Sequence, residues 1–168
     1  MKESRPISLD QFRAGMQQLA AGVSVITTNH EGDRAGLTAT AVCSLSAEPA
    51  RLLVSVNRAG YTFGLIAASR RLCVNILSSG QSDIAMLFAS PAPNGAEDRF
   101  ATGEWRTDAT GAPVLGGALV TFDCRVGSII DTGSHGVVIA DIVHSDVDPD
   151  LSPLLYARGK FAQLADLA

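Results

Sequence analysis

The residues best suited to binding chemistry lie in the stretch from Gly36 to Ser46, which reads GLTATAVCSLS. If this stretch is a β-strand, Thr38, Thr40 and Val42 share one face, because side chains alternate along a strand. A strand that only fills a core favours larger β-branched or aromatic residues. Small side chains instead let a large flat ligand approach the backbone, while hydroxyl and N–H groups bind polar or anionic atoms. An ordinary threonine-rich edge strand is the alternative interpretation.

A second group of polar residues follows the apolar run that begins at Leu52. The run predicts a strand ending at Asn57 and Arg58, and Thr62 is placed to cap a short helix beyond it. A strand that leads into a helix N-terminus suits a phosphate, because backbone N–H groups and the helix dipole favour an anion there. A plain capped helix explains the same residues without any ligand.

The familiar catalytic signatures are absent from the sequence, which has no GxGxxG, GxxxxGK[ST], GxSxG or HExxH pattern. Three histidines without clustered carboxylates argue against a catalytic metal. Asp131, Ser134 and His135 lie too close on one predicted turn to form a hydrolase triad, in which the base separates nucleophile and carboxylate. We interpret His30 and His144 as surface residues. His135, at a predicted hairpin tip, is either a solvent-facing turn residue or a binding residue.

Length, charge and composition limit the class of protein. The 168 residues predict one domain over residues 1–168. A formal charge of −4 argues against general binding to nucleic acid or anionic lipid. No apolar run approaches the ~20 residues that cross a bilayer, and the first six residues do not resemble a secretory signal. Cys43, Cys73 and Cys124 are widely spaced and odd in number, so we expect free, buried thiols and a cytoplasmic protein.

Patterns along the chain predict mostly strands. Ser8 and Gln11 match a capping box, and the apolar spacing after them predicts a helix to about Ala20. A hairpin turn is expected at residues 30–33, and short helices after Thr62 and around Phe88. Strands are expected at residues 23–28, 36–46, 52–57, 72–77, 120–126, 137–143 and 154–161.

The second half of the chain begins with residues 91–117, where glycines and prolines predict a long irregular loop anchored by Phe100 and Trp105. Alternation after Val120 predicts a strand with one buried face. A hairpin centred near Gly133 places Arg125 opposite Asp141, and Cys124 opposite Ile142. About seven strands without regular βαβ alternation predict an antiparallel sheet curled into a small barrel, with helices at its ends.

Six segments, in this order, resemble the short-chain NAD(P)H:flavin oxidoreductase family, whose members supply reduced flavin to two-component monooxygenases. The segments are Gly36–Ser46, Val54–Arg58 with Thr62, Cys73–Ser78, Gly111–Leu115 with Phe122–Cys124, Gly133–His135, and Pro153–Phe161. The resemblance implies a mainly β (α+β) fold, an antiparallel, Greek-key-like split β-barrel with a few flanking helices. It also implies a homodimer that binds FMN or FAD near its interface.

The resemblance assigns roles to individual residues. The flavin ring and ribityl chain would be bordered by Thr38, Ala39, Thr40 and Ala41. The ring or its phosphate end would be bound by Ser55, Val56, Asn57 and Thr62, and Phe161 would pack near the flavin. The nicotinamide nucleotide, NADH or NADPH, would be contacted by His135 and Tyr156. Two residues depart from the family pattern: Ser134 replaces an acidic residue, and Ala50 replaces a proline. Because hydride transfer is chemistry of the cofactors, the protein need only hold nicotinamide C4 against flavin N5 at roughly 3–3.5 Å. We therefore expect no catalytic side chain and no metal.

Two other functions remain open at this stage. A non-catalytic split barrel that holds flavin or haem, as a carrier or sensor, would share the fold, since a fold does not fix a function. An oxidase of the pyridoxamine-phosphate type also shares the barrel, but it calls for a basic phosphate pocket, and the chain has only 13 lysines and arginines. The sequence does not decide between FMN and FAD or between NADH and NADPH. It also does not identify a partner monooxygenase.

Overall fold

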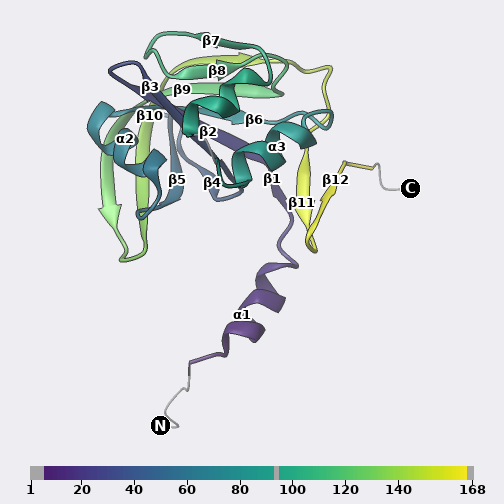
Figure 1. Cartoon of the computed structure of the whole chain (residues 1–168). Helices are drawn as coiled ribbons and strands as arrows, with labels where there is room; N and C mark the ends of the chain where they lie inside the picture. The colour runs from purple at the N-terminus through teal and green to yellow at the C-terminus, as the bar shows by residue number, and fades with distance from the viewer. Residues whose placement is uncertain (1–5, 93–94, 166–168) are drawn as a thin grey trace.

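The computed structural model describes residues 6–92 and 95–165 of the chain (Figure 1). Strands dominate these residues, and short helices lie between them. In chain order the elements are α1 (Leu9–Met16), β1 (Ala21–Gly22), β2 (Ser24–His30), β3 (Asp33–Ala39), β4 (Val42–Ser46), β5 (Arg51–Asn57), α2 (Tyr61–Ser69), β6 (Arg71–Ile76), α3 (Ser82–Ala89), the 3-10 helix η1 (Ala96–Ala101), β7 (Trp105–Thr107), β8 (Pro113–Leu115), β9 (Val120–Asp131), β10 (His135–Val147), β11 (Leu155–Ala157) and β12 (Lys160–Ala162).

Seven strands form one antiparallel sheet in the order β3-β2-β6-β9-β10-β5-β4. Its two edge strands, β3 and β4, follow one another in the chain, and only Thr40 and Ala41 separate them. Three peptide steps from Ala39 to Val42 span at most about 11 Å, so the edges must lie close together. The sheet therefore curls into a barrel that stays split between β3 and β4, as the split-barrel prediction requires.

Helix α2 closes one end of the barrel and packs against β2 and β3 in the main core. Ile66 is fully buried among strand residues, and Gly136 on β10 leaves the space that the Phe63 ring occupies. A Cβ at Gly136 would lie 2.4 Å from Phe63 Cε2, so a side chain there would force the Phe63 ring to move. Gly60 is the N-cap, and Thr62 lies buried within the helix, where its hydroxyl donates to the Gly36 carbonyl. The prediction that Thr62 caps α2 is therefore wrong.

Residues 95–117 are more regular than the glycines and prolines predict. They contain η1 and the β7–β8 hairpin, which covers the outer face of β2 and β6. The buried Asn75 side chain joins the layers, accepting from Leu115 N at 2.8 Å and donating to Val25 O at 3.0 Å. This cover also buries Asp123 on β9, so the prediction of a single buried face for β9 is wrong. Phe100 and Trp105 do act as anchors, with ring centroids 4.9 Å apart.

Helix α1 is shorter than the apolar spacing predicts. The capping box of Ser8 and Gln11 is present, but the helix ends at Met16 and not near Ala20. It stands apart from the barrel, and none of its residues is buried among the described residues (Figure 1). Its end is held by Arg158, whose N–H donates to the Gln17 carbonyl at 2.7 Å. Without a packed face, only these end contacts and the capping box order the helix.

Two hairpins form the C-terminal part of the chain. The β9–β10 hairpin has the predicted register, whereas the β11–β12 hairpin replaces one predicted strand. In the β9–β10 hairpin, Arg125 pairs with Asp141, and Cys124 with Ile142, as expected. The expected strand over residues 154–161 is instead the β11–β12 hairpin. It turns at Arg158 and Gly159, both with positive φ, as a two-residue hairpin turn requires. Within the described part of the chain, no helix is both long and apolar enough to cross a membrane.

Candidate functional site

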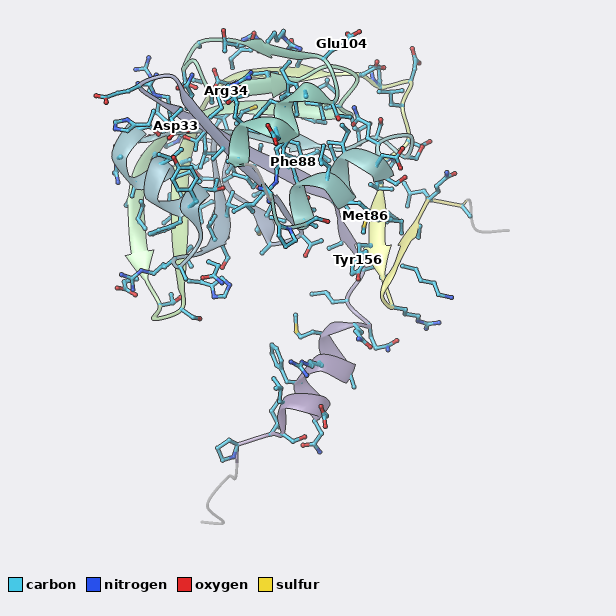
Figure 2. The ribbon with its side chains drawn as sticks, in the orientation of Figure 1. Asp33, Arg34, Met86, Phe88, Glu104 and Tyr156 are labelled. Atoms are coloured by element: carbon cyan, nitrogen blue, oxygen red, sulfur yellow. The ribbon has the colours of Figure 1, made fainter. Side chains whose placement is uncertain are left out.

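The first cavity lies where the end of β3 meets α3 and the β11–β12 hairpin, and we call it the β3–α3 pocket. Its volume is about 220 Å³. Figure 2 shows two of its lining residues, Met86 on α3 and Tyr156 on β11, on the same side of the molecule. It is lined by Val23, Thr38, Ala39, Thr40, Ala85, Met86, Ala89, Tyr156 and Phe161. Five of the residues assigned to a ligand site from the sequence thus meet here from two distant segments, the end of β3 and the β11–β12 hairpin.

The walls of the β3–α3 pocket are held in place by identifiable contacts. The Thr38 hydroxyl donates to the Ala85 carbonyl at 2.6 Å, which joins the edge strand β3 to α3. On the opposite wall, Tyr156 and Phe161 are partners across the hairpin, and their rings meet edge to face at 5.6 Å. Ala85 and Ala89 stand four residues apart on one helix face, so that face carries little bulk. The result is a narrow space between small side chains and an aromatic pair.

A second, larger cavity adjoins the first, and we call it the β3–α2 pocket. Its volume is about 810 Å³, and Ala89 lines both cavities. Gly36, Leu37 and Thr62 form part of its wall, and Arg99 supplies a guanidinium. Thr62 therefore lies beside Leu37, the residue that precedes Thr38 in β3. The two cavities together follow β3 along most of its length.

Arg99 is the unusual charge in the wall of the β3–α2 pocket. Its guanidinium donates to the Gly36 carbonyl at 2.9 Å and to the Ser90 carbonyl, but it has no carboxylate partner among the described residues. Its Nε is buried and has no hydrogen-bond partner there. Burial lowers the pKa of Arg99, because the charged form loses water. This cation is thus poorly compensated by the protein itself, and an anion in the pocket would compensate it.

The mouth of the β3–α2 pocket carries two neutralised pairs. The Tyr61 hydroxyl donates to Asp33, and this hydrogen bond, more than burial or charge, raises the pKa of Tyr61. Arg34 forms an ion pair with Glu97, including an Nε–Oε2 contact of 3.1 Å. That hydrogen bond is also the main reason why the pKa of Arg34 is raised. Figure 2 shows Asp33 and Arg34 side by side at the start of β3.

Three other residues assigned from the sequence, Val56, Asn57 and His135, lie at the β9–β10 hairpin tip or beside it at the end of β5. His135 is paired with Asn57 across β10 and β5, and its Nδ1 lies 2.9 Å from the Ser134 hydroxyl. Asn57 accepts from Ala59 N at 2.9 Å as the chain turns toward α2. Val56 is 1% exposed, so its side chain belongs to the core and only its backbone is available to a ligand. His135 therefore stands in the main sheet, whereas Tyr156 lies in the separate β1-β11-β12 sheet.

The break between β3 and β4 exposes a third cavity, of about 540 Å³, on the other side of Thr40. Thr40 lines this cavity as well as the β3–α3 pocket. Ala41 follows it, and its carbonyl accepts from Ser55 N at 3.0 Å. Cys43 is an exposed free thiol in the cavity wall, so the expectation of three buried thiols is wrong for this residue. The predicted single strand over 36–46 is thus two edge strands with an accessible corner between them.

The residues that α3 and η1 contribute were not expected from the sequence. Ala85, Met86 and Ala89 lie in a helix that was predicted, but its small-residue face was not recognised. The signal was the spacing of Ala85 and Ala89, four residues apart. Arg99 lies within the stretch expected to be irregular, and nothing in its local pattern distinguishes it.

One cluster does bring carboxylates together with a histidine, contrary to the expectation from the sequence. Asp108, His144 and Asp146 bring their potential ligand atoms within 4.8 Å of one another. The Arg106 guanidinium lies among them, 3.3 Å from Asp108 and also paired with Asp146. A cation of the protein thus already occupies the place that a metal ion would take, and the geometry gives no support for a metal there.

Comparison with known proteins decides the family. Residues 16–165 match the model of the flavin reductase like domain, which covers nearly all of the chain beyond α1. The chain belongs to this family. The FMN reductase (NADH) RutF of Ancylobacter novellus is 42% identical over 137 residues, covering 82% of this chain and 75% of the relative. That of Agrobacterium fabrum is 38% identical over 163 residues, covering 97% and 92%.

Solved structures of the flavin reductase family share the fold. Flavin reductase PheA2 is 31% identical and superposes with a TM-score of 0.84, covering 95% of this chain and all of its own. Nitrilotriacetate monooxygenase component B from Mycobacterium thermoresistibile is 33% identical, with a TM-score of 0.86 and coverage of 93% and 86%. BorF, the flavin reductase component of a bacterial two-component tryptophan halogenase, is 26% identical, with a TM-score of 0.86 and coverage of 95% and 100%. The split-barrel prediction is confirmed.

Proposed function

We propose that this chain is an NAD(P)H-dependent flavin reductase that transfers hydride from reduced nicotinamide to a flavin, with NADH and FMN as the preferred pair. The observation that carries the proposal is the β3–α3 pocket, which joins Thr38, Ala39 and Thr40 to Tyr156 and Phe161. The choice of NADH and FMN is supported by the names of the RutF relatives. FAD and NADPH are the alternatives to be measured against them.

The β3–α3 pocket suits the ring of a flavin, which supplies the hydride-accepting chemistry when bound. Ala39, Ala85 and Ala89 present little bulk, and Tyr156 and Phe161 present aromatic surface. The volume of about 220 Å³ is below the ~300–1,000 Å³ of pockets that enclose a whole drug-sized ligand. The pocket therefore holds only part of the ligand, and the rest must extend beyond it. The shared residue Ala89 makes the β3–α2 pocket the natural continuation.

The polar end of the ligand is assigned to Arg99 in the β3–α2 pocket. Its guanidinium has no carboxylate partner among the described residues, and its Nε lacks any hydrogen bond there. Arginine binds phosphate through charge-assisted hydrogen bonds. Thr62 lines the same pocket but already donates to Gly36, so we give it a structural role beside the phosphate. Asn57 and His135 would then serve the nicotinamide nucleotide or a second copy of the chain.

We propose that the protein binds and orients the flavin and the nicotinamide, and that no side chain transfers a proton. The hydroxyls of Thr38 and Thr62 are engaged as donors to carbonyls, and Tyr61 is held protonated by Asp33. We propose that the enzyme is a homodimer and supplies reduced flavin to a partner oxygenase in the cytoplasm. The name of BorF, the flavin reductase component of a two-component halogenase, supports the transfer of reduced flavin to a partner enzyme. Light scattering of the purified chain tests the homodimer.

Steady-state oxidation of NADH and NADPH, with FMN, FAD and riboflavin in turn, tests the proposed function. We expect flavin-dependent loss of absorbance at 340 nm, fastest with NADH and FMN. A protein that retains a visible chromophore but does not oxidise either nicotinamide would be a carrier or sensor, and that result would contradict the proposal.

A further inference from the structure

A row of charged residues crosses the sheet, outside the β3–α3 and β3–α2 pockets. Arg71 on β6 is the register partner of Arg125 on β9, and Arg125 is the partner of Asp141 on β10. Asp141 is in turn the partner of Arg51 on β5. Like charges directly opposite each other on neighbouring strands repel and destabilise the pair. The Arg71–Arg125 pair therefore calls for a compensating negative charge.

No carboxylate of the described residues forms an ion pair with either of these two arginines. The Asp141 carboxylate pairs with Arg51, with Nε and Oδ1 2.6 Å apart, and not with Arg125. The Asp123 carboxylate accepts from the backbone and hydroxyl of Thr110 and forms no ion pair with Arg71 or Arg125 among the described residues. Among the described residues, neither Arg71 nor Arg125 has a carboxylate within ion-pair distance.

A third arginine joins the pair at the C-terminal end of α2. Arg70 is the C-cap of α2 and has a left-handed backbone conformation, with φ of 56°. Its guanidinium donates to the Gly127 carbonyl at 2.8 Å, and it too lacks a carboxylate partner among the described residues. The Arg71 guanidinium donates to the Thr110 carbonyl, also at 2.8 Å. Backbone carbonyls thus hold two of the three guanidinium groups in fixed positions.

These arginines line one cavity of about 250 Å³, together with Ser69, Ala109 and Thr110. The lining offers guanidinium donors and no carboxylate, while the Thr110 and Ser69 hydroxyls are already bonded within the protein. Planar guanidinium groups match the oxygens of phosphate, and several of them together favour a doubly charged anion. The volume is below the ~300–1,000 Å³ that encloses a drug-sized ligand. The space therefore encloses a phosphate group with at most a small substituent.

We propose that the cavity between the end of α2 and Arg125 is a binding site for a phosphate dianion, carried either by inorganic phosphate or by a small phosphate monoester. Arg125 supplies the exposed guanidinium that closes on the anion, and Arg70 and Arg71 supply the fixed ones. The site shares no lining residue with the β3–α3 or β3–α2 pocket. It stands independently of the proposed flavin reductase activity.

Isothermal titration calorimetry with inorganic phosphate at pH 7.5 and constant ionic strength tests this site. We expect one saturable site per chain and a loss of affinity of at least tenfold in Arg125→Gln. The matched control is Arg13→Gln on α1, which removes the same charge from an exposed position and should leave the affinity within twofold. Arg70→Gln is the second site variant and should weaken binding at least threefold. Absence of saturable binding, or equal losses in Arg125→Gln and Arg13→Gln, would overturn the proposal.

A thermal unfolding series separates this site from a general effect of charge and identifies the anion. Saturating phosphate should raise the midpoint of the wild type and leave that of Arg125→Gln unchanged. Glycerol phosphate is titrated in parallel as the monoester. Arg125-dependent binding of either compound supports the site and shows which source it accepts. Failure of both compounds to bind would refute it.

Discussion

The Thr38 hydroxyl donates a hydrogen bond to the Ala85 carbonyl over 2.6 Å, and this contact fixes the end of β3 against α3. Both residues line the β3–α3 pocket, so the width of the pocket depends on this bond. A threonine expected to face a ligand is therefore also a structural link between strand and helix.

Replacing Thr38 by valine removes this bond and with it the link between β3 and α3. We expect Thr38→Val to lower the free energy of unfolding by about 0.5–1.5 kcal/mol, measured by urea denaturation. We also expect a severalfold rise in the KM for FMN, because α3 is released. Thr107→Val, at an exposed strand position, is the control and should change neither value. Equal stabilities of the two variants would show that the Thr38 bond is not formed in solution.

The assignment of Arg99 to a phosphate predicts a difference between FMN and riboflavin. In Arg99→Gln the KM for FMN should rise about tenfold to a hundredfold, since hydrogen bonds to charged groups contribute about 1.5–3 kcal/mol. The KM for riboflavin, which has no phosphate, should stay within twofold. Arg106→Gln, which removes a charge paired with Asp108 and Asp146, is the control. A parallel rise for both flavins would indicate a general distortion of the pocket and not the loss of a phosphate contact.

We predict that the reaction requires no proton donor from the protein. His135, the histidine assigned to nicotinamide binding, tests this prediction. For His135→Ala we expect a KM for NADH raised severalfold and a kcat reduced less than tenfold. Ser134→Ala, which removes only the hydroxyl 2.9 Å from the His135 ring, should have a smaller effect on both. A thousandfold fall in kcat at saturating NADH, with binding intact, would make His135 a catalytic residue.

Burial of Cys124 predicts a loss of stability at high pH. Burial, followed by the nearby charges of Asp123 and Asp141, raises the pKa of Cys124 to about 12 from an ordinary value of 9.0. The folded thiol keeps its proton while the unfolded one loses it, so this contribution to stability is complete below pH 9 and is lost as pH rises toward 12. The loss is at most about 1.4 kcal/mol for each pH unit in that range.

The measurement is the urea midpoint at pH 8 and pH 10.5 in the wild type and in Cys124→Ala. The variant should be less stable at pH 8, because the core loses volume, yet its midpoint should fall less between the two pH values. Identical slopes would show that Cys124 does not control this pH dependence.

The parts of the fold that depend on local pattern were predictable from the sequence. Turn residues around Gly133 set the β9–β10 register, and Ser8 with Gln11 set the start of α1. The end of α1 was not predictable, because the apolar spacing beyond Met16 has no surface of the described chain to pack on. The one-sided burial expected for β9 was wrong for a similar reason. The β7–β8 segment covers its outer face, and a strand pattern does not reveal what lies above it.

The candidate site was predictable in part, because the resemblance named residues but not their distances. Thr38, Thr40 and Phe161 meet in one pocket, whereas Asn57 and His135 lie together elsewhere in the sheet. The grouping follows from the split between β3 and β4 and from the separate β11–β12 hairpin. Both are long-range features that no local pattern encodes.

The central claim is that a flavin binds along β3 beside α3 and accepts hydride there. The most direct measurement is NADH oxidation against FMN concentration in the wild type, in Ala89→Leu and in Ala67→Leu. Ala89 is exposed and lines both pockets, so leucine fills them without disturbing the core; Ala67 is exposed on α2 and serves as the matched control. We predict a KM for FMN at least tenfold higher in Ala89→Leu and within twofold in Ala67→Leu. Unchanged kinetics in Ala89→Leu, or no flavin-dependent NADH oxidation by the wild type, would contradict the claim.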